Sequence, residues 1–379
     1  MERVLFTARP DWQNKVEQWG LTFHSESGLP YWDEAIYYQF TAIEIDTLEN
    51  ATNELERLCN EAVQHIIDAD RFAEFGITQP ISELIKWAWE AEPPSLFGRF
   101  DLAYDGSGPP KMLEYNADTP TSLLEAAVIQ WKWLQECFPD SDQFNSIWEH
   151  LVAQWKWLSD NRKLRGSLIH FAHTDTAEDE MTVVMLRDTA QEAGLVTDQL
   201  LMERIGWDNY KGYFTDLQDR RIWSIFKLYP WEWLVKESFS ANLIKTYRDT
   251  QWIEPIWKML LSNKALLPIL WEMFPGHENL LPAYLDSPRE LADFVKKPLL
   301  GREGANVTIS AHGQTVETDG PFADGGFVYQ ALAPMMTFDG KTPIIGSWIV
   351  GGEACGMGIR ESDGLITDNL SRFVPHRFL

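Results

Sequence analysis

Two short segments of alternating polar and apolar residues, joined by a turn, constrain the fold of this 379-residue chain most. They are residues 99–104 (RFDLAY) and 111–117 (KMLEYNA), and the Asp-Gly and Pro-Pro pairs between them mark a turn. Side chains alternate between the two faces of a strand, so the pattern predicts an antiparallel hairpin with one polar face. We expect Tyr104 and Lys111 to close the turn.

The predicted pairing places Asp101 opposite Glu114 and Arg99 opposite Asn116. Two carboxylates that face each other across strands repel one another. A divalent cation between them would remove this repulsion, and Asp, Glu and Asn supply the oxygen ligands that Mg²⁺ takes. The pattern therefore indicates either a metal site or the solvated polar face of a surface hairpin.

The pattern of apolar residues in the rest of the sequence predicts helices mainly in the first half of the chain and strands mainly in the second half. Apolar spacing near 3.6 indicates helices, and short apolar runs between turn signals indicate strands. Ser122 and Glu125 have the spacing of a capping box at the start of one helix. We therefore expect an α+β or mixed α/β protein, with helices over residues 46–71, 79–92, 123–138, 178–193 and 263–275, and strands over 167–171 and 223–228 and within 294–310, 325–332 and 346–361.

Charge and composition exclude several classes of protein. The chain carries 57 acidic and 32 basic residues, a formal net charge of −25, which disfavours binding to a nucleic-acid phosphate backbone. Its three cysteines are far apart, so neither a disulfide framework nor a zinc site is indicated. The first residues lack a signal-peptide pattern, and no apolar run reaches the roughly 18 residues of a membrane span. We expect a soluble cytoplasmic protein.

Lys264 is informative through its position. If Ser262 or Asn263 caps the following helix, this lysine stands in the first turn, where the helix dipole disfavours a cation. A bound anion would explain it, because exposed N–H groups and the ammonium could share one phosphate. The alternative is a solvated surface lysine.

Several segments, in order and across nearly the whole chain, resemble the glutathionylspermidine synthase-like ATP-grasp ligases. The similarity is greatest to short bacterial members that carry only the synthetase portion and are provisionally assigned as acid–amine ligases. The segments are GRFDLA (98–103), LEYNADTPTS (113–122), NKALLPIL (263–270), KPLLGREGANV (297–307), VYQAL (328–332), GIRE (358–361) and LIT (365–367).

The resemblance implies an α+β protein with the ATP-grasp fold of the glutathione synthetase or glutathionylspermidine synthetase type. It also implies an ATP-dependent ligase that joins a small-molecule or peptide carboxylate to an amine through an acyl phosphate. We expect a helical segment with the metal-binding hairpin (1–160), an α/β substrate-side segment (161–250) and a nucleotide-binding lid with the C-terminal strands (251–379). The alternative is a nucleotide-binding regulatory protein of the same fold, with slow ATPase activity and no ligation.

The resemblance also assigns site residues by their position in the matching segments. It makes Arg99 the catalytic residue that stabilises the transferring phosphate. Two Mg²⁺ ions would be held by Asp101, Glu114 (bridging) and Asn116. ATP would be bound by Arg99, Phe100, Asp101, Lys264, Lys297, Gly304, Gln330 and Ile366. Substrate contacts are expected from Thr119, Thr121, Ser122, Glu178, Asp179, Arg302 and Arg360.

Overall fold

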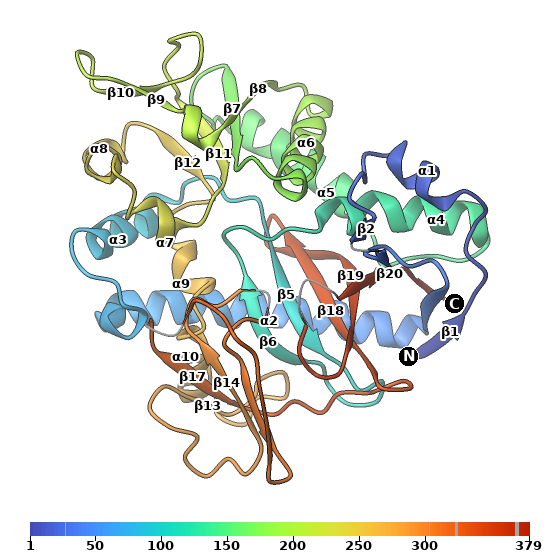
Figure 1. Cartoon of the computed structure of the whole chain (residues 1–379). Helices are drawn as coiled ribbons and strands as arrows, with labels where there is room; N and C mark the ends of the chain where they lie inside the picture. Colours follow the sequence, from blue (N-terminus) through green and yellow to red (C-terminus); the bar gives the residue numbers. More distant parts are fainter. Residues whose placement is uncertain (27, 303, 323–324, 368–370) are drawn as a thin grey trace.

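The computed structural model describes residues 1–26, 28–302, 304–322, 325–367 and 371–379 (Figure 1). A five-stranded antiparallel sheet forms its centre, and the long helix α2 (Ala42–Asp68) lies against strands β18 and β19 of this sheet. The strand order is β20 (Arg372–Val374), β19 (Glu353–Asp363), β18 (Lys341–Val350), β5 (Phe97–Ala103) and β6 (Lys111–Asn116). The predicted hairpin is therefore β5–β6, at one edge of the central sheet.

A second sheet has four parallel strands, with helices packed against it. Its order is β12 (Gln251–Ile253), β11 (Ser224–Leu228), β7 (Leu168–His173) and β8 (Val196–Leu201). Helix α6 (Ala177–Glu192) connects β7 to β8 and packs on α5 (Ile147–Asp160). These bounds confirm the strands expected at 167–171 and 223–228 and the helix expected at 178–193.

A third sheet is antiparallel and comes from the last third of the chain. Its order is β13 (Ala283–Tyr284), β17 (Phe327–Ala331), β14 (Phe294–Pro298), β15 (Thr308–Ala311) and β16 (Gln314–Glu317). Helix α10 (Leu266–Met273) packs on β13 and β17, and Pro268 lies in its first turn, where proline is tolerated. The short helix α9 (Lys258–Leu261) precedes it.

The two ends of the chain meet in a small sheet. Strand β4 (Ile36–Phe40) lies between β1 (Glu2–Leu5) and β21 (His376–Phe378), and Figure 1 shows the two termini close together. The remaining elements are α1 (Trp12–Glu17), β2 (Ser25–Glu26), β3 (Leu29–Pro30), η1 (Arg71–Phe75), α3 (Ile81–Ala91), η2 (Glu125–Ile129), α4 (Gln130–Cys137), η3 (Met202–Arg204), β9 (Gly206–Asp208), β10 (Tyr213–Thr215), α7 (Trp231–Leu234) and α8 (Ser240–Thr246).

The sheets join segments that are distant in the sequence. Strand β18 pairs with β5, about 240 residues earlier in the chain, and β12 pairs with β11. The division into residues 1–160, 161–250 and 251–379 stays a prediction. No helix in the described ranges is long and apolar enough to cross a membrane.

The predicted capping box at Ser122 is wrong. Ser122 has a φ of 71°, whereas a capping residue has an extended backbone. Glu125 is buried and accepts a hydrogen bond of 2.7 Å from the Tyr31 hydroxyl. A true capping box begins α2, where Thr41 and Glu44 bond each other's backbone N–H groups, and this moves the helix start from residue 46 to 42.

Candidate functional site

The polar face of hairpin β5–β6 has the predicted register. Arg99 pairs with Asn116, and Asp101 with Glu114. A bulge after Asp101 shifts the remaining pairs by one residue, so Lys111 lies opposite Ala103. The expected closure of the turn by Tyr104 and Lys111 is therefore wrong, while the pairing at the polar face is confirmed.

Arg99 is held firmly on this face. Its Nε and Nη2 donate to the two oxygens of Asp101 at 2.7 and 3.2 Å, and its Nη1 donates to the Thr121 carbonyl at 2.8 Å. Gly346 on the adjacent strand β18 makes room for the Arg99 side chain, because a methyl group at position 346 would lie only 2.9 Å from Arg99 Cδ. The guanidinium is thus positioned before any ligand binds.

The two carboxylates differ in their electrostatic surroundings. Burial opposes ionisation of Glu114, but the ammonium groups of Lys264 and Lys297 outweigh it and lower its pKa to about 2. Lys264 Nζ is 2.9 Å from Glu114 Oε2. Burial raises the pKa of Asp101; Arg99 opposes this shift and Glu114 adds to it. The surroundings therefore favour ionisation of Glu114 and disfavour ionisation of Asp101.

The donor set fits a hard cation. Asp101, Glu114 and Asn116 converge, with Asn116 Nδ2 3.1 Å from Glu114 Oε1, and turning the amide over would present its oxygen. Among the described residues, no group of three or more His, Cys, Asp and Glu side chains is placed to hold a metal ion. A cation here would use two carboxylates and one amide, leaving positions for water and phosphate oxygens, as Mg²⁺ prefers.

A narrow cavity of about 130 Å³ separates the hairpin from the third sheet. Lys297 on β14 and Gln330 on β17 lie in its wall, as do Gly304 and Ile366. Lys297 Nζ donates to Gln330 Oε1 at 2.8 Å and to the Leu113 carbonyl at 3.2 Å. Burial and the charge of Lys264 lower the pKa of Lys297 to about 8, and Glu114 offsets part of this shift.

A loop that carries Gly301 and Gly304, here called the glycine loop, closes one side of this narrow cavity. Gly304 has a φ of 67°, and a methyl group there would come within 2.5 Å of the Thr367 carbonyl oxygen. A side chain at this position would therefore push the loop away from the segment that carries Ile366 and Thr367. The described part of the loop thus needs glycine for both its conformation and its close approach.

A wide cavity of about 530 Å³ adjoins the narrow one and shares Asp101, Glu114 and Lys264 with it. It gathers most of the residues that the sequence proposes for catalysis, metal binding and substrate binding: Arg99, Asn116, Thr119, Thr121, Glu178, Asp179, Arg302 and Arg360. These come from the hairpin, the loop after it, the first turn of α6, the glycine loop and β19.

Two predicted residues line neither cavity. The Phe100 side chain is fully buried on the opposite face of β5 and stacks on Tyr115, with ring centroids 3.8 Å apart. Ser122 is buried, with its backbone in the left-handed region. Neither side chain faces these cavities, and the assignment of Phe100 to ATP and of Ser122 to substrate stays a prediction.

Several cavity residues are absent from the sequence-based prediction. Glu232 and Trp233 follow β11, and Glu232 Oε1 accepts a bond of 3.0 Å from Arg302 Nη2. Thr174 and Thr176 follow β7. Because β7 and β11 are adjacent parallel strands, their carboxyl ends meet at one edge, where α/β proteins commonly bind ligands. The strands predicted at 167–171 and 223–228 were the available signal, because the residues that directly follow two adjacent parallel strands are candidates for a ligand site.

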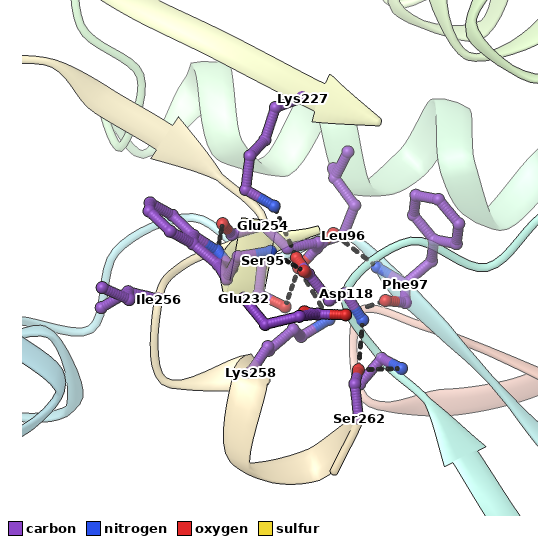
Figure 2. Close-up of polar contacts among 12 residues, drawn as sticks. Ser95, Leu96, Phe97, Asp118, Lys227, Glu232, Glu254, Ile256, Lys258 and Ser262 are labelled. Atoms are coloured by element: carbon purple, nitrogen blue, oxygen red, sulfur yellow. Dashed lines mark hydrogen bonds and ion pairs between the residues drawn. The ribbon is translucent and has the colours of Figure 1, made fainter. Parts of the chain in front are cut away.

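A buried polar network lies behind the loop that follows the hairpin (Figure 2). Asp118 Oδ1 is 2.5 Å from Lys227 Nζ, and the Trp231 N–H donates to Asp118 Oδ2 at 2.8 Å. The Asp118 N–H donates to Ser262 Oγ at 2.9 Å. Both charges are almost fully buried; burial raises the pKa of Asp118 and lowers that of Lys227, and each charge opposes the shift of the other. The network fixes the segment that carries the two cavity threonines.

A second buried pair adjoins the first (Figure 2). Glu254 accepts the N–H groups of Leu96 and Phe97 at 2.8 and 3.1 Å and pairs with Lys258 at 2.6 Å. Lys258 also donates to the Phe97 carbonyl at 2.6 Å. Strand β5 is therefore anchored where it begins, two residues before Arg99.

Replacing Lys227 with methionine should destabilise the fold by about 3–5 kcal/mol, because it leaves the Asp118 carboxylate buried without its partner. Urea unfolding measures the effect, and Lys245→Met on an exposed position of α8 serves as the control. Adding Asp118→Asn to Lys227→Met should restore part of the loss. Equal stability of Lys227→Met and wild type would show that the pair does not hold this loop.

Comparisons with known proteins identify the family and several relatives of this chain. The family model described as glutathionylspermidine synthase preATP-grasp matches residues 3–379. A Haemophilus influenzae protein provisionally named an acid–amine ligase is 42% identical over the full length of both chains.

Two longer relatives match as well. The trypanothione synthetase of Crithidia fasciculata is 29% identical over 84% of this chain and 52% of its own length. The bifunctional glutathionylspermidine synthetase/amidase of Escherichia coli is 27% identical over 89% of this chain and 58% of its own. The chain thus spans little more than half of these two enzymes. Its match over nearly all residues shows that it belongs to the glutathionylspermidine synthase preATP-grasp family.

Proposed function

We propose that this protein is an ATP-dependent carboxylate–amine ligase with the ATP-grasp fold, acting through an acyl phosphate. One observation carries the proposal: two facing carboxylates, a fixed arginine and two lysines converge on a pair of adjoining cavities. The carboxylates suit a divalent cation, and the three basic side chains suit phosphate groups in a protein whose net charge is −25. The names of three relatives, an acid–amine ligase and two synthetases, support the same reaction class.

The reaction overcomes the poor leaving group of a carboxylate. A carboxylate oxygen of the acid attacks the γ-phosphorus of ATP, and the bond to ADP breaks. The amine nitrogen then attacks the carbonyl carbon, the carbon–oxygen bond to phosphate breaks, and the amine loses a proton. In phosphoryl transfer the protein acts mainly by positioning and by neutralising charge.

Each group of residues takes one part of this task. Lys264 and Lys297 would neutralise the nucleotide phosphates, and Arg99 the phosphoryl group in transit. Asp101, Glu114 and Asn116 would hold Mg²⁺, which supplies charge neutralisation at the phosphate oxygens when bound. Thr119, Thr121, Arg302 and Arg360 would contact the acid, and Glu178 and Asp179 the amine.

A panel of acids and amines tests the proposal. Purified protein with Mg-ATP is incubated with pairs of peptides, amino acids and polyamines, ADP release is recorded, and mass spectrometry searches for the condensation product. We expect ADP release that requires both partners and one amide product per ADP. ADP release that no acid or amine changes would favour the regulatory alternative.

Lys264→Met and Lys297→Met should each weaken nucleotide binding by about 10- to 100-fold, as expected for a charged hydrogen bond to phosphate. The double variant should be close to inactive. Titration with ATP and Mg²⁺ measures the affinities. Lys296→Met is the matched control, because its ammonium lies over the Phe327 ring on the other face of β14. Unchanged affinity in both single variants would reject this nucleotide site.

A further inference from the structure

A third cavity, of about 750 Å³, lies outside the site described above. It is lined by the segment after α1, by η2 and α4, by the start of α5 and by α6. Helices α1, α4, α5 and α6 lie near one another in Figure 1. We call it the peripheral cavity. It shares no residue with the two cavities at the hairpin, although Ala177 and Glu180 face it from the same turn of α6 that gives Glu178 and Asp179 to the wide cavity.

The walls of the peripheral cavity are apolar and aromatic. Trp19, Trp131 and Trp148 line it, together with Met181 and Val184. Trp19 is 49% exposed and Val184 38%, so a large apolar surface stays open to solvent. A concave surface of this size and composition is typical of a site for a small organic molecule.

The backbone is irregular where it forms this wall. Residues 125–129 make a π-helical turn, which widens the helix and is often found at functional sites. It places Ala127 and Val128 toward the peripheral cavity, while Glu125 points away to the Tyr31 hydroxyl. The widened turn thus separates an apolar wall from a buried carboxyl group.

The rim of the peripheral cavity is acidic. Glu149, Glu180 and Asp188 stand around it, and within the described residues none of the three forms an ion pair. Burial raises the pKa of Asp188, and Arg187 offsets only part of this shift. Lys132 is the single lysine or arginine in the described lining, so the rim has a net negative charge.

An ammonium group already lies on one aromatic wall. Lys132 Nζ is 4.4 Å from the centroid of the Trp19 ring, within the range of a cation–π contact. Indole faces bind cations better than other aromatic side chains do, and they also bind apolar chains. Aromatic walls and an acidic rim together select a ligand with a positive charge and an apolar body.

We propose that the peripheral cavity binds an amphipathic organic cation, namely a primary ammonium group on an apolar chain or ring. The ammonium would lie at the acidic rim and the apolar part against the tryptophans. An amphipathic anion would meet repulsion from the rim, and a neutral molecule would lack the charge interaction. This site goes beyond the proposed ligase reaction and does not depend on it.

Calorimetry with three probes of equal chain length tests the charge preference. Titration of the nucleotide-free protein with n-hexylamine, hexan-1-ol and hexanoate should give about tenfold tighter binding of the amine than of the alcohol, and weaker binding of the acid. The amine preference should shrink at high salt. Equal binding of amine and alcohol, or absence of saturable amine binding, would overturn the proposal.

Variants and methionine NMR test the location. Glu180→Gln with Asp188→Asn should lower hexylamine affinity about tenfold and leave hexanol unchanged, while Glu90→Gln on exposed α3 should change neither. In protein labelled at the methionine methyl groups, hexylamine should shift the Met181 and Met185 signals. If Glu178→Gln, in the wide cavity, abolishes binding instead and these signals stay unshifted, the amine binds elsewhere and the proposal fails.

Discussion

Asp101→Asn and Glu114→Gln should each abolish turnover with Mg-ATP, while the chain stays folded. Either change removes one of the two carboxylates that face each other on the hairpin and leaves the shape of the side chain nearly the same. A cation site with only two carboxylates cannot lose one without losing most of its affinity for Mg²⁺. We expect at least about a 10³-fold loss of turnover, comparable to the loss of a major charge-stabilising group.

The fold should tolerate these changes. Burial and Glu114 already raise the pKa of Asp101, so a neutral amide at position 101 removes an unfavourable charge. Thermal unfolding should show nearly wild-type stability for Asp101→Asn. Glu114→Gln should be folded but less stable, because Lys264 and Lys297 outweigh burial, lower the pKa of Glu114 to about 2 and lose their charge partner in this variant. Asp105→Asn is the matched control, because Asp105 lies in the turn of the same hairpin and bonds the Ser107 and Gly108 N–H groups through one oxygen. Wild-type turnover of either site variant at saturating Mg-ATP would refute the metal assignment.

Arg99→Ala should lower kcat and kcat/KM together by about 10²–10³, because the guanidinium acts on charge that develops during phosphoryl transfer. Its effect on the affinity for Mg-ATP should be small. Hydroxylamine, which traps an acyl phosphate as a hydroxamate, should give product with wild type and an acid substrate, and almost none with the variant.

The structural role of Arg99 adds a second effect that must be measured separately. Its removal leaves Asp101 and the Thr121 carbonyl without their donors, which should cost about 1–3 kcal/mol of stability. Assays are therefore made well below the unfolding temperature. If Arg99→Ala hydrolyses ATP as wild type does, and no acid or amine stimulates either protein, the regulatory alternative is correct.

The sequence predicted local structure well where one strand or helix carries the pattern. Period-two alternation located β5 and β6 and placed Asp101 opposite Glu114. It could not predict the bulge after Asp101, where Leu113 has no partner on β5. The bulge leaves the alternation of polar and apolar residues along β6 unchanged, so the sequence pattern does not reveal it. The Ser122 capping box failed for a similar reason: its spacing is satisfied, but tertiary packing turns Glu125 toward Tyr31.

Contacts between distant segments were beyond the sequence pattern. Strand β4 pairs in parallel with β21 across more than three hundred residues, a pairing that no pattern within either short segment indicates. Asp118 and Lys227 are 109 residues apart, and each alone is an ordinary charged residue. The residues after β7 and β11 reach the wide cavity only because the two strands lie side by side. Such residues need the assembled fold to be recognised.

The central claim is that the acid is activated by phosphoryl transfer, and an oxygen-isotope measurement tests it most directly. The acid substrate found with the panel is labelled with ¹⁸O in its carboxylate and ligated with Mg-ATP and the amine. Because the attacking carboxylate oxygen leaves with phosphate, the account predicts one ¹⁸O atom in the inorganic phosphate for each amide formed. Amide formation with unlabelled phosphate would contradict the account.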